Sequence, residues 1–202
     1  KILFVLACIL LLSSLVVWVS QFHVIVFLFL IASSVAVSNS LHTREAHGFI
    51  DQDTNYQRLW VADVNDKETR HTIRYLNTDY RGSQGAQFLD GTDDLVLEYT
   101  KFYRLAQHFK PHAQKALAVG GGVYAVPRDF LKRVPDGTID VVEIDPGVTA
   151  IAEKYFNLTT DSRMHIYHQD GRTFINTHKK KYDVIFMDAF KEYHSIPYHL
   201  TT

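Results

Sequence analysis

The chain has 202 residues, with 21 Lys and Arg against 22 Asp and Glu, and a formal net charge of −1. This balance argues against a nucleic-acid partner, because proteins of that class carry a basic surface. A single cysteine, Cys8, excludes an internal disulfide and a cysteine-based metal site. The 11 histidines show no metal-binding spacing, so we expect no metal.

Residues 1–40 are predicted to form a transmembrane segment of one or two helices. No Asp, Glu, Lys or Arg occurs in residues 2–43, and the apolar run over residues 2–19 is long enough to cross a bilayer. A polar break at residues 20–23 precedes a second apolar run over residues 24–37. Two short crossings fit this pattern, and so does one crossing followed by a partly buried helix.

Two alternatives to the membrane interpretation are a cleaved signal peptide and a buried helical hairpin. A signal peptide has a shorter apolar core than this region. In a two-crossing arrangement Lys1 and Arg44 lie on the same side, and positive residues favour the cytoplasmic side.

Residues 41–110 are predicted to form a linker and a small N-terminal β-hairpin domain with a helix. Residues 41–53 have the polar composition of a linker. Residues 56–63 and 72–77 are rich in aromatic and β-branched residues and flank a turn-forming stretch at 65–68, which indicates a hairpin. Apolar residues recur at helical spacing over residues 95–109, which predicts a helix.

Residues 111–202 are predicted to form a parallel α/β sheet. Apolar runs at residues 116–119, 139–145, 164–167 and 182–187 are expected to be strands, and helical segments lie between them. The helix after the second strand begins at Pro146, a residue favoured at the first helical position. Asp145, just before it, is a candidate cap.

Glycine or acidic residues follow each of the predicted strands. In chain order they are Gly120, Gly121 and Gly122, then Glu143, then Asp170 and Gly171, and finally Asp188. Ligands of doubly wound sheets bind outside the carboxyl ends of the strands. Glycines let a backbone approach a ligand closely, and an acidic residue at the position of Glu143 commonly accepts hydrogen bonds from ribose. These residues together predict a nucleoside-binding cleft.

Each of these residues also has a purely structural interpretation. The glycine triplet could be a tight turn, the acidic residues could cap helices, and Asp170 with Gly171 could be a plain turn. The dinucleotide pattern G-x-G-x-x-G is not matched, because Val123, Tyr124 and Ala125 follow the triplet. This mismatch argues against NAD.

The order of these motifs resembles the spermidine synthase (polyamine aminopropyltransferase) family over residues 53–200, and most closely its membrane-fused bacterial branch. The motifs are Asn-Tyr-Gln at 55–57, Glu-Tyr at 98–99, the glycine triplet, Val-Val-Glu-Ile-Asp-Pro at 141–146, Lys-Tyr-Phe at 154–156, Asp-Gly-Arg-Thr-Phe at 170–174 and Tyr-Asp-Val-Ile at 182–185. The resemblance implies a Rossmann-like, class I methyltransferase-type parallel sheet behind a small β-domain. The family's sheet has further strands, so we expect a C-terminal truncation here.

The resemblance also implies roles for individual residues. Gln57 would contact the nucleoside donor, Glu143 its ribose and Asp170 its adenine amino group. Tyr99 would line the amine pocket. Asp188 would be the catalytic carboxylate that orients the attacking amine and accepts its proton.

The co-substrate would be decarboxylated S-adenosylmethionine or S-adenosylmethionine, with no prosthetic group. The partners would be a polyamine or other amine such as putrescine, membrane lipid, and further copies of the chain in a homo-oligomer. The expected location is the bacterial inner membrane, with the catalytic domain in the cytoplasm.

Two positions depart from the family pattern. Val123 stands where the family has Asp next to the glycine triplet, and Lys191 stands where it has an acidic residue. Three functions therefore stay open: aminopropyl transfer in polyamine biosynthesis, S-adenosylmethionine-dependent methyl transfer, and non-catalytic nucleoside binding by a membrane module.

Overall fold

The computed structural model describes residues 2, 5–9, 21–46, 49–67, 70–78 and 83–189. The chain divides into two compact units, Lys1–Gly48 and Phe49–Thr202. The antiparallel and the parallel strands thus fall in one unit. A separate domain boundary near residue 110 stays a prediction.

The N-terminal unit contains the helix α2 (Gln21–Ala46). Residues 21–23, predicted as part of a polar break, begin this helix, and residues 41–46, predicted as linker, complete it. The linker prediction was therefore wrong for these residues, because the helix continues past the end of the apolar run. Residues 10–20, which include much of the first predicted crossing, lie outside the described residues. Within the residues that are described, no helix combines the length and the apolar character needed to cross a membrane.

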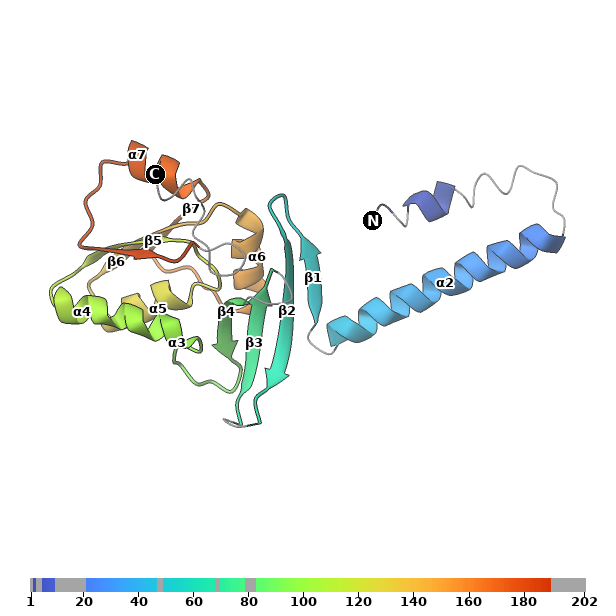
Figure 1. The fold of residues 1–202 in the computed structure, drawn as a ribbon, viewed down its shortest axis with the longest axis horizontal. Coiled ribbons are helices and arrows are strands. Elements are labelled where there is room, and N and C mark those ends of the chain that lie inside the picture. The colour runs from blue at the N-terminus through green and yellow to red at the C-terminus, as the bar shows by residue number, and fades with distance from the viewer. Residues whose placement is uncertain are drawn as a thin grey trace. The chain divides into compact units, whose positions relative to one another are not determined.

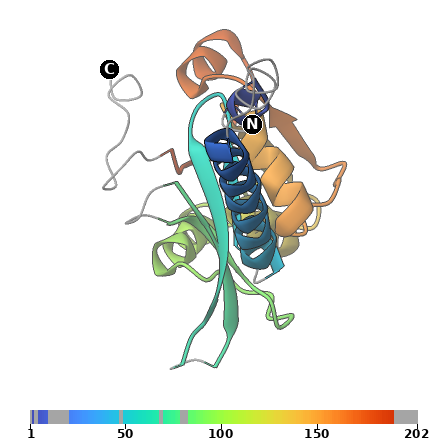
Figure 2. The ribbon, with the colours of Figure 1, turned by 90° about the vertical axis from the view of Figure 1, so that its right-hand side faces the viewer.

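The second unit begins with a four-stranded antiparallel sheet (Figures 1 and 2). Its strands, in spatial as in chain order, are β1 (Ile50–Asp53), β2 (Arg58–Asn65), β3 (Thr72–Asn77) and β4 (Ser83–Phe88). The predicted hairpin is confirmed, since Val61 pairs with Leu76 across β2 and β3. The outer strands β1 and β4 were not predicted. Their sequences, IDQD and SQGAQF, lack the apolar alternation that indicates a strand.

A helical segment links the two sheets. It consists of α3 (Glu98–Lys101), a 3₁₀ turn (Phe102–Arg104) and α4 (Leu105–Phe109), close to the single helix predicted over residues 95–109. Leu95 is buried, but Phe102 and Phe109 are largely exposed. The apolar spacing therefore predicted the helix correctly, but the apolar residues that define it do not all lie on a buried face.

Within residues 83–189 the parallel sheet has four strands, as predicted. The strands are β5 (Lys115–Val119), β6 (Thr138–Val142), β7 (Met164–Tyr167) and β8 (Val184–Met187). The helices between them are α5 (Ala125–Arg133), α6 (Pro146–Tyr155) and α7 (Gly171–Thr177). The spatial order is β7-β6-β5-β8, with all neighbours parallel. The strand order therefore reverses at β5, and the β5–β8 pair forms the switch point where doubly wound sheets bind ligands.

Alternating side chains on β5 face two different layers of the core. Ala116 and Ala118 pack in one apolar cluster with Phe130 of α5, while Leu117 and Val119 pack in another with Phe174 of α7. Helix α6 lies between the two sheets (Figure 1). Its Val148 and Ile151 pack against buried side chains of β2 and β3. This apolar layer holds the antiparallel sheet beside the carboxyl ends of the parallel strands.

Candidate functional site

The glycine loop at residues 120–122 joins β5 to the turn before α5. Gly120 has a φ of +98° and Gly122 a φ of +51°, in the region that favours glycine. A Cβ on Gly120 would lie 2.5 Å from the carbonyl oxygen of Asp188, and one on Gly122 would lie 2.7 Å from that of Gln84. The glycines thus allow close approach to the ends of β8 and β4, in addition to any approach to a ligand.

Glu143 follows β6 and holds the glycine loop in place. The amide of Gly121 donates to its Oε2 at 2.8 Å, and the amide of Asp145 donates to its Oε1 at 2.9 Å. Burial raises the pKa of the Glu143 carboxyl, although these backbone hydrogen bonds oppose the shift. Its ribose-binding role stays a prediction.

Asp145 caps α6, as the sequence indicated. The amide of Gly147 donates to its Oδ1 at 2.9 Å. The other carboxylate oxygen lies 2.7 Å from the hydroxyl of Thr54, which is also 2.8 Å from the carbonyl oxygen of Gln57. Gln57 is therefore in a turn close to Asp145, which follows β6, and its contact with the nucleoside stays a prediction. Thr54, which connects the two, was missed by the sequence analysis.

Asp170 and Gly171 lie at the start of α7. The amide of Thr173 donates to Oδ1 of Asp170 at 2.8 Å, so Asp170 caps this helix. The capping interpretation thus holds for Asp170, and its contact with adenine stays a prediction. Gly171 is the buried first residue of α7.

A chain of hydrogen bonds links the end of the glycine loop to the end of β7. The hydroxyl of Tyr124 lies 2.7 Å from that of Thr149, which lies 3.0 Å from Nε2 of His168. Tyr124 is fully buried, has a φ of +59°, and packs its ring over Gly121. No sequence motif predicted these hydrogen bonds, because Tyr124, Thr149 and His168 belong to different parts of the fold.

Asp188 directly follows β8. Burial raises the pKa of its carboxyl to about 6, and hydrogen bonds from Tyr99 and Tyr103 act in the opposite direction. The hydroxyl of Tyr103 has two acceptors within reach, Oδ1 of Asp188 at 3.4 Å and the carbonyl oxygen of Met187 at 3.0 Å. Tyr103 was not predicted. The sequence could have suggested Tyr103, because it follows Tyr99 by four residues and that spacing places two side chains on the same helix face.

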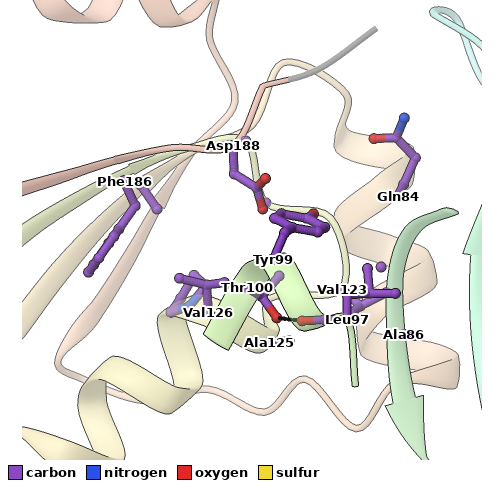
Figure 3. Close-up of a pocket in the computed structure, with 15 residues that line it drawn as sticks. Gln84, Ala86, Leu97, Tyr99, Thr100, Val123, Ala125, Val126, Phe186 and Asp188 are labelled. Atoms are coloured by element: carbon purple, nitrogen blue, oxygen red, sulfur yellow. Dashed lines mark hydrogen bonds between the residues drawn. The ribbon is translucent and has the colours of Figure 1, made fainter. Parts of the chain in front are cut away.

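A hollow lies between the glycine loop and Asp188 (Figure 3). Tyr99, Gly120, Gly121 and Asp188 line it, so four of the predicted site residues meet there. Figure 3 shows the ring of Tyr99 beside the carboxylate of Asp188. The other five predicted site residues, Gln57, Gly122, Glu143, Asp170 and Gly171, are not part of the lining. Glu143, Asp170 and Gly171 follow β6 and β7, the neighbouring strands toward the other edge of the sheet, and Gln57 lies in the turn between β1 and β2.

Val123, the first departure from the family pattern, is buried and also borders the hollow. It packs with Leu59 and Val61 in the apolar layer beneath the antiparallel sheet. A Cβ on Gly85 would lie 2.7 Å from its side chain, so β4 passes directly over it. The second departure, Lys191, lies outside the described residues.

This arrangement joins two chemical capabilities. The glycine loop, held by Glu143, presents backbone at the ends of β5 and β6, where nucleosides bind in this class of sheet. Asp188 supplies a carboxylate whose pKa of about 6 suits it to exchange protons near neutral pH. The structure therefore places a proton-accepting carboxylate beside the glycine loop at the β5–β8 switch point.

Comparison with known proteins places the sequence in a family. Residues 100–200 match the family model for the spermine/spermidine synthase domain. A polyamine aminopropyltransferase from Vibrio vulnificus is 33% identical over 124 residues, which are 59% of this chain and 41% of that protein. The chain spans about half the length of the curated relatives it matches.

Two solved structures share the fold. A probable spermidine synthase from Corynebacterium glutamicum matches with a TM-score of 0.61 and 20% identity, over 76% of this chain and 56% of that one. A spermidine synthase in complex with the transition-state analogue AdoDATO matches with a TM-score of 0.58 and 20% identity, over 76% of this chain and 50% of that one. These likenesses confirm the Rossmann-like, methyltransferase-type α/β fold that the sequence predicted.

Proposed function

The chain belongs to the spermine/spermidine synthase family, and on this basis we propose that its site transfers an aminopropyl group from decarboxylated S-adenosylmethionine to an amine such as putrescine. The observation that carries the proposal is the pairing of Asp188 with the glycine loop at the β5–β8 switch point. A proton-accepting carboxylate at this place lies next to the position where the strand ends hold a nucleoside.

The reaction is a displacement at carbon. The nitrogen of a neutral amine attacks the aminopropyl carbon bonded to the sulfonium, the carbon–sulfur bond breaks, and its electron pair stays on sulfur to give methylthioadenosine. Before attack, the ammonium form of the acceptor gives one proton to Asp188, which passes it to solvent. Holding both reactants in line supplies much of the rate enhancement.

The donor would lie along the carboxyl ends of β5, β6 and β7. In this proposal Glu143 binds the ribose, Asp170 faces the adenine amino group and Gln57 contacts the nucleoside. Glu143 supports this role in two ways: it is buried at the end of β6, and it positions Gly121. Tyr99 borders the hollow on the acceptor side, next to Asp188.

The test is to identify the nucleoside product. The purified full-length protein is incubated with decarboxylated S-adenosylmethionine and a panel of amines, and we expect methylthioadenosine together with an aminopropylated amine. With S-adenosylmethionine as donor, S-adenosylhomocysteine would instead indicate methyl transfer, the alternative that Val123 favours. Neither product, together with an unchanged cellular phenotype for Asp188→Asn, would support the non-catalytic membrane module.

We further propose that residues 1–40 hold the protein at the bacterial inner membrane, with residues 49–202 in the cytoplasm, and that the protein forms a homo-oligomer. The membrane proposal is supported by the absence of charged residues over 2–43 and by exposed apolar side chains on α2, such as Ile25, Leu28 and Phe29. Carbonate extraction of membranes should leave the protein in the pellet, and recovery in the supernatant would contradict the proposal. Light scattering in detergent would give the oligomeric state.

A further inference from the structure

The turn between β1 and β2, residues 54–57, lies against the start of α6. The hydroxyl of Thr54 donates to Oδ2 of Asp145 at 2.7 Å, between positions 91 residues apart in the chain. A Cβ on Gly147 would overlap the Cγ2 methyl of Thr54, so the turn can approach the helix this closely only because a glycine is there. Thr54 therefore attaches the antiparallel sheet to the segment that follows β6.

The same hydroxyl oxygen also shapes the turn. The amides of Tyr56 and Gln57 donate to Oγ1 of Thr54 at 3.1 and 3.0 Å. The amide of Thr54 donates to the carbonyl oxygen of Gln57 at 2.9 Å, which closes the turn. Since that carbonyl already has a donor, the hydroxyl hydrogen of Thr54 is available for the carboxylate of Asp145, which is the stronger acceptor.

Asp145 is a fixed point for this attachment. It is only 1% exposed, and the amide of Gly147 donates to its Oδ1 at 2.9 Å. Its own amide donates to Oε1 of Glu143, also at 2.9 Å. Hydrogen bonds therefore run from Glu143 through Asp145 to Thr54, and from Thr54 to the amide of Gln57. These bonds set the backbone of Gln57 relative to the carboxylate of Glu143.

This geometry gives Thr54 a role in donor binding that depends on the proposed function, in which Gln57 and Glu143 contact the same nucleoside. We infer that Thr54 is a positioning residue, which holds Gln57 where it can bind the donor together with Glu143. Thr54 should affect the affinity for the donor and not proton transfer, because Asp188 follows β8, which β5 separates from β6.

The first experiment is calorimetric titration of the full-length protein and of Thr54→Val with methylthioadenosine. Valine keeps the size of the side chain and removes the hydroxyl. We expect the Kd to rise by about tenfold, as for loss of a hydrogen bond to a charged group, with the binding stoichiometry unchanged. With decarboxylated S-adenosylmethionine as donor, KM should rise while kcat at saturating donor changes by less than about twofold.

A purely structural role for Thr54 predicts a different result. Destabilised protein would contain fewer molecules able to bind, so the stoichiometry and the apparent kcat would fall while the Kd of the folded fraction stayed the same. That outcome would overturn the inference. A wild-type protein that neither binds methylthioadenosine nor forms it with any amine would overturn the proposed function as well.

Two further variants act as controls. Thr54→Ser keeps the hydroxyl and should retain the wild-type Kd. Thr72→Val makes the valine change elsewhere in the antiparallel sheet, where the hydroxyl of Thr72 donates to Oδ1 of Asn65 at 2.8 Å, and it should leave the Kd unchanged. Binding as weak in either control as in Thr54→Val would contradict a specific role for the Thr54 hydroxyl.

A double-mutant cycle tests whether Thr54 acts through Gln57. Gln57→Ala removes the side chain that Thr54 is inferred to position, so adding Thr54→Val should weaken methylthioadenosine binding little further. Two substitutions that share one interaction give effects that are not additive. Kd increases that multiply in the double variant, or a Gln57→Ala variant with the wild-type Kd, would overturn the inference.

Discussion

The hydroxyl of Tyr103 lies 3.4 Å from Oδ1 of Asp188 and places a second phenol beside a carboxylate that already contacts Tyr99. The rings of Tyr99 and Tyr103 meet edge to face, with centroids 6.3 Å apart. Tyr103 also packs edge-on against Phe186, with centroids 5.5 Å apart. The two phenols are uncharged hydrogen-bond donors, and they partly offset the rise in the pKa of Asp188 that burial causes.

The rate should depend on the ionisation of Asp188. Its carboxyl has a pKa of about 6, and only the carboxylate accepts a proton. We expect kcat/KM, calculated for the ammonium form of the amine, to fall as the pH decreases through about 6, by up to tenfold per pH unit. A corrected profile that stays flat down to the ordinary pKa range of an aspartate would contradict the assignment.

Tyr103→Phe should move this profile to higher pH. The substitution removes one of the hydrogen bonds that lower the pKa of Asp188, while the ring that packs against Phe186 remains. Tyr182→Phe is the matched control, because Tyr182 donates to Asp140 at 2.6 Å and is not among the groups that affect the pKa of Asp188. The midpoint should move only in Tyr103→Phe, and equal shifts in both variants would exclude a direct effect.

Asp188→Asn should lower activity and raise stability. Loss of the proton acceptor should reduce kcat by about 10²–10⁴-fold. The folded-state pKa of Asp188 lies above its unfolded value, so ionisation destabilises the fold, and stability is lost as the pH rises from about 4 to about 6.

The gain in stability should accordingly depend on pH. Asn carries no charge, so the variant should unfold with a free energy higher by on the order of 1–2 kcal/mol at about pH 8, and the gain should vanish near pH 4. Urea unfolding at both pH values measures this difference. A variant less stable than wild type at about pH 8 would show that the carboxylate stabilises the fold.

Glu143→Gln should weaken donor binding. Both carboxylate oxygens of Glu143 accept backbone amides, and a glutamine NH₂ group cannot accept the one from Gly121 or Asp145. We expect the Kd for methylthioadenosine to rise by about tenfold or more, as for loss of a hydrogen bond to a charged group. Glu153→Gln, the same change at an exposed position of α6, should leave this Kd unchanged. Calorimetric titration of both variants makes the comparison.

Thr149→Val should destabilise the unit by about 1–3 kcal/mol, because the buried hydroxyl of Tyr124 would lose its partner. Thr149→Ser keeps the hydroxyl and should retain most of the stability. Urea unfolding of the two variants separates the hydrogen bond from the loss of the methyl group. Equal stability of Thr149→Val and wild type would mean that the hydrogen bonds linking Tyr124, Thr149 and His168 do not stabilise the fold.

Periodicity and residue type were sufficient to predict the parallel part of the fold. Buried parallel strands are apolar runs, so β5, β6, β7 and β8 could be located from composition alone. Asp145 and Pro146 marked the start of α6 because capping is a local interaction. In contrast, β1 and β4 bury few apolar side chains, and their pairing depends on backbone hydrogen bonds that leave no pattern in the sequence.

The sequence by itself determined which residues end each strand, and hence that Gly120, Glu143, Asp170 and Asp188 belong to one edge of a sheet. Only the tertiary structure decided that β8 lies next to β5, so that Gly120 directly contacts Asp188 while Asp170 caps a helix farther along that edge. It also decided that Tyr103 faces Asp188 and that Thr149 joins Tyr124 to His168. Strand order and side-chain contacts between elements result from the packing of the whole core, whereas strand ends and helix caps depend on a few neighbouring residues.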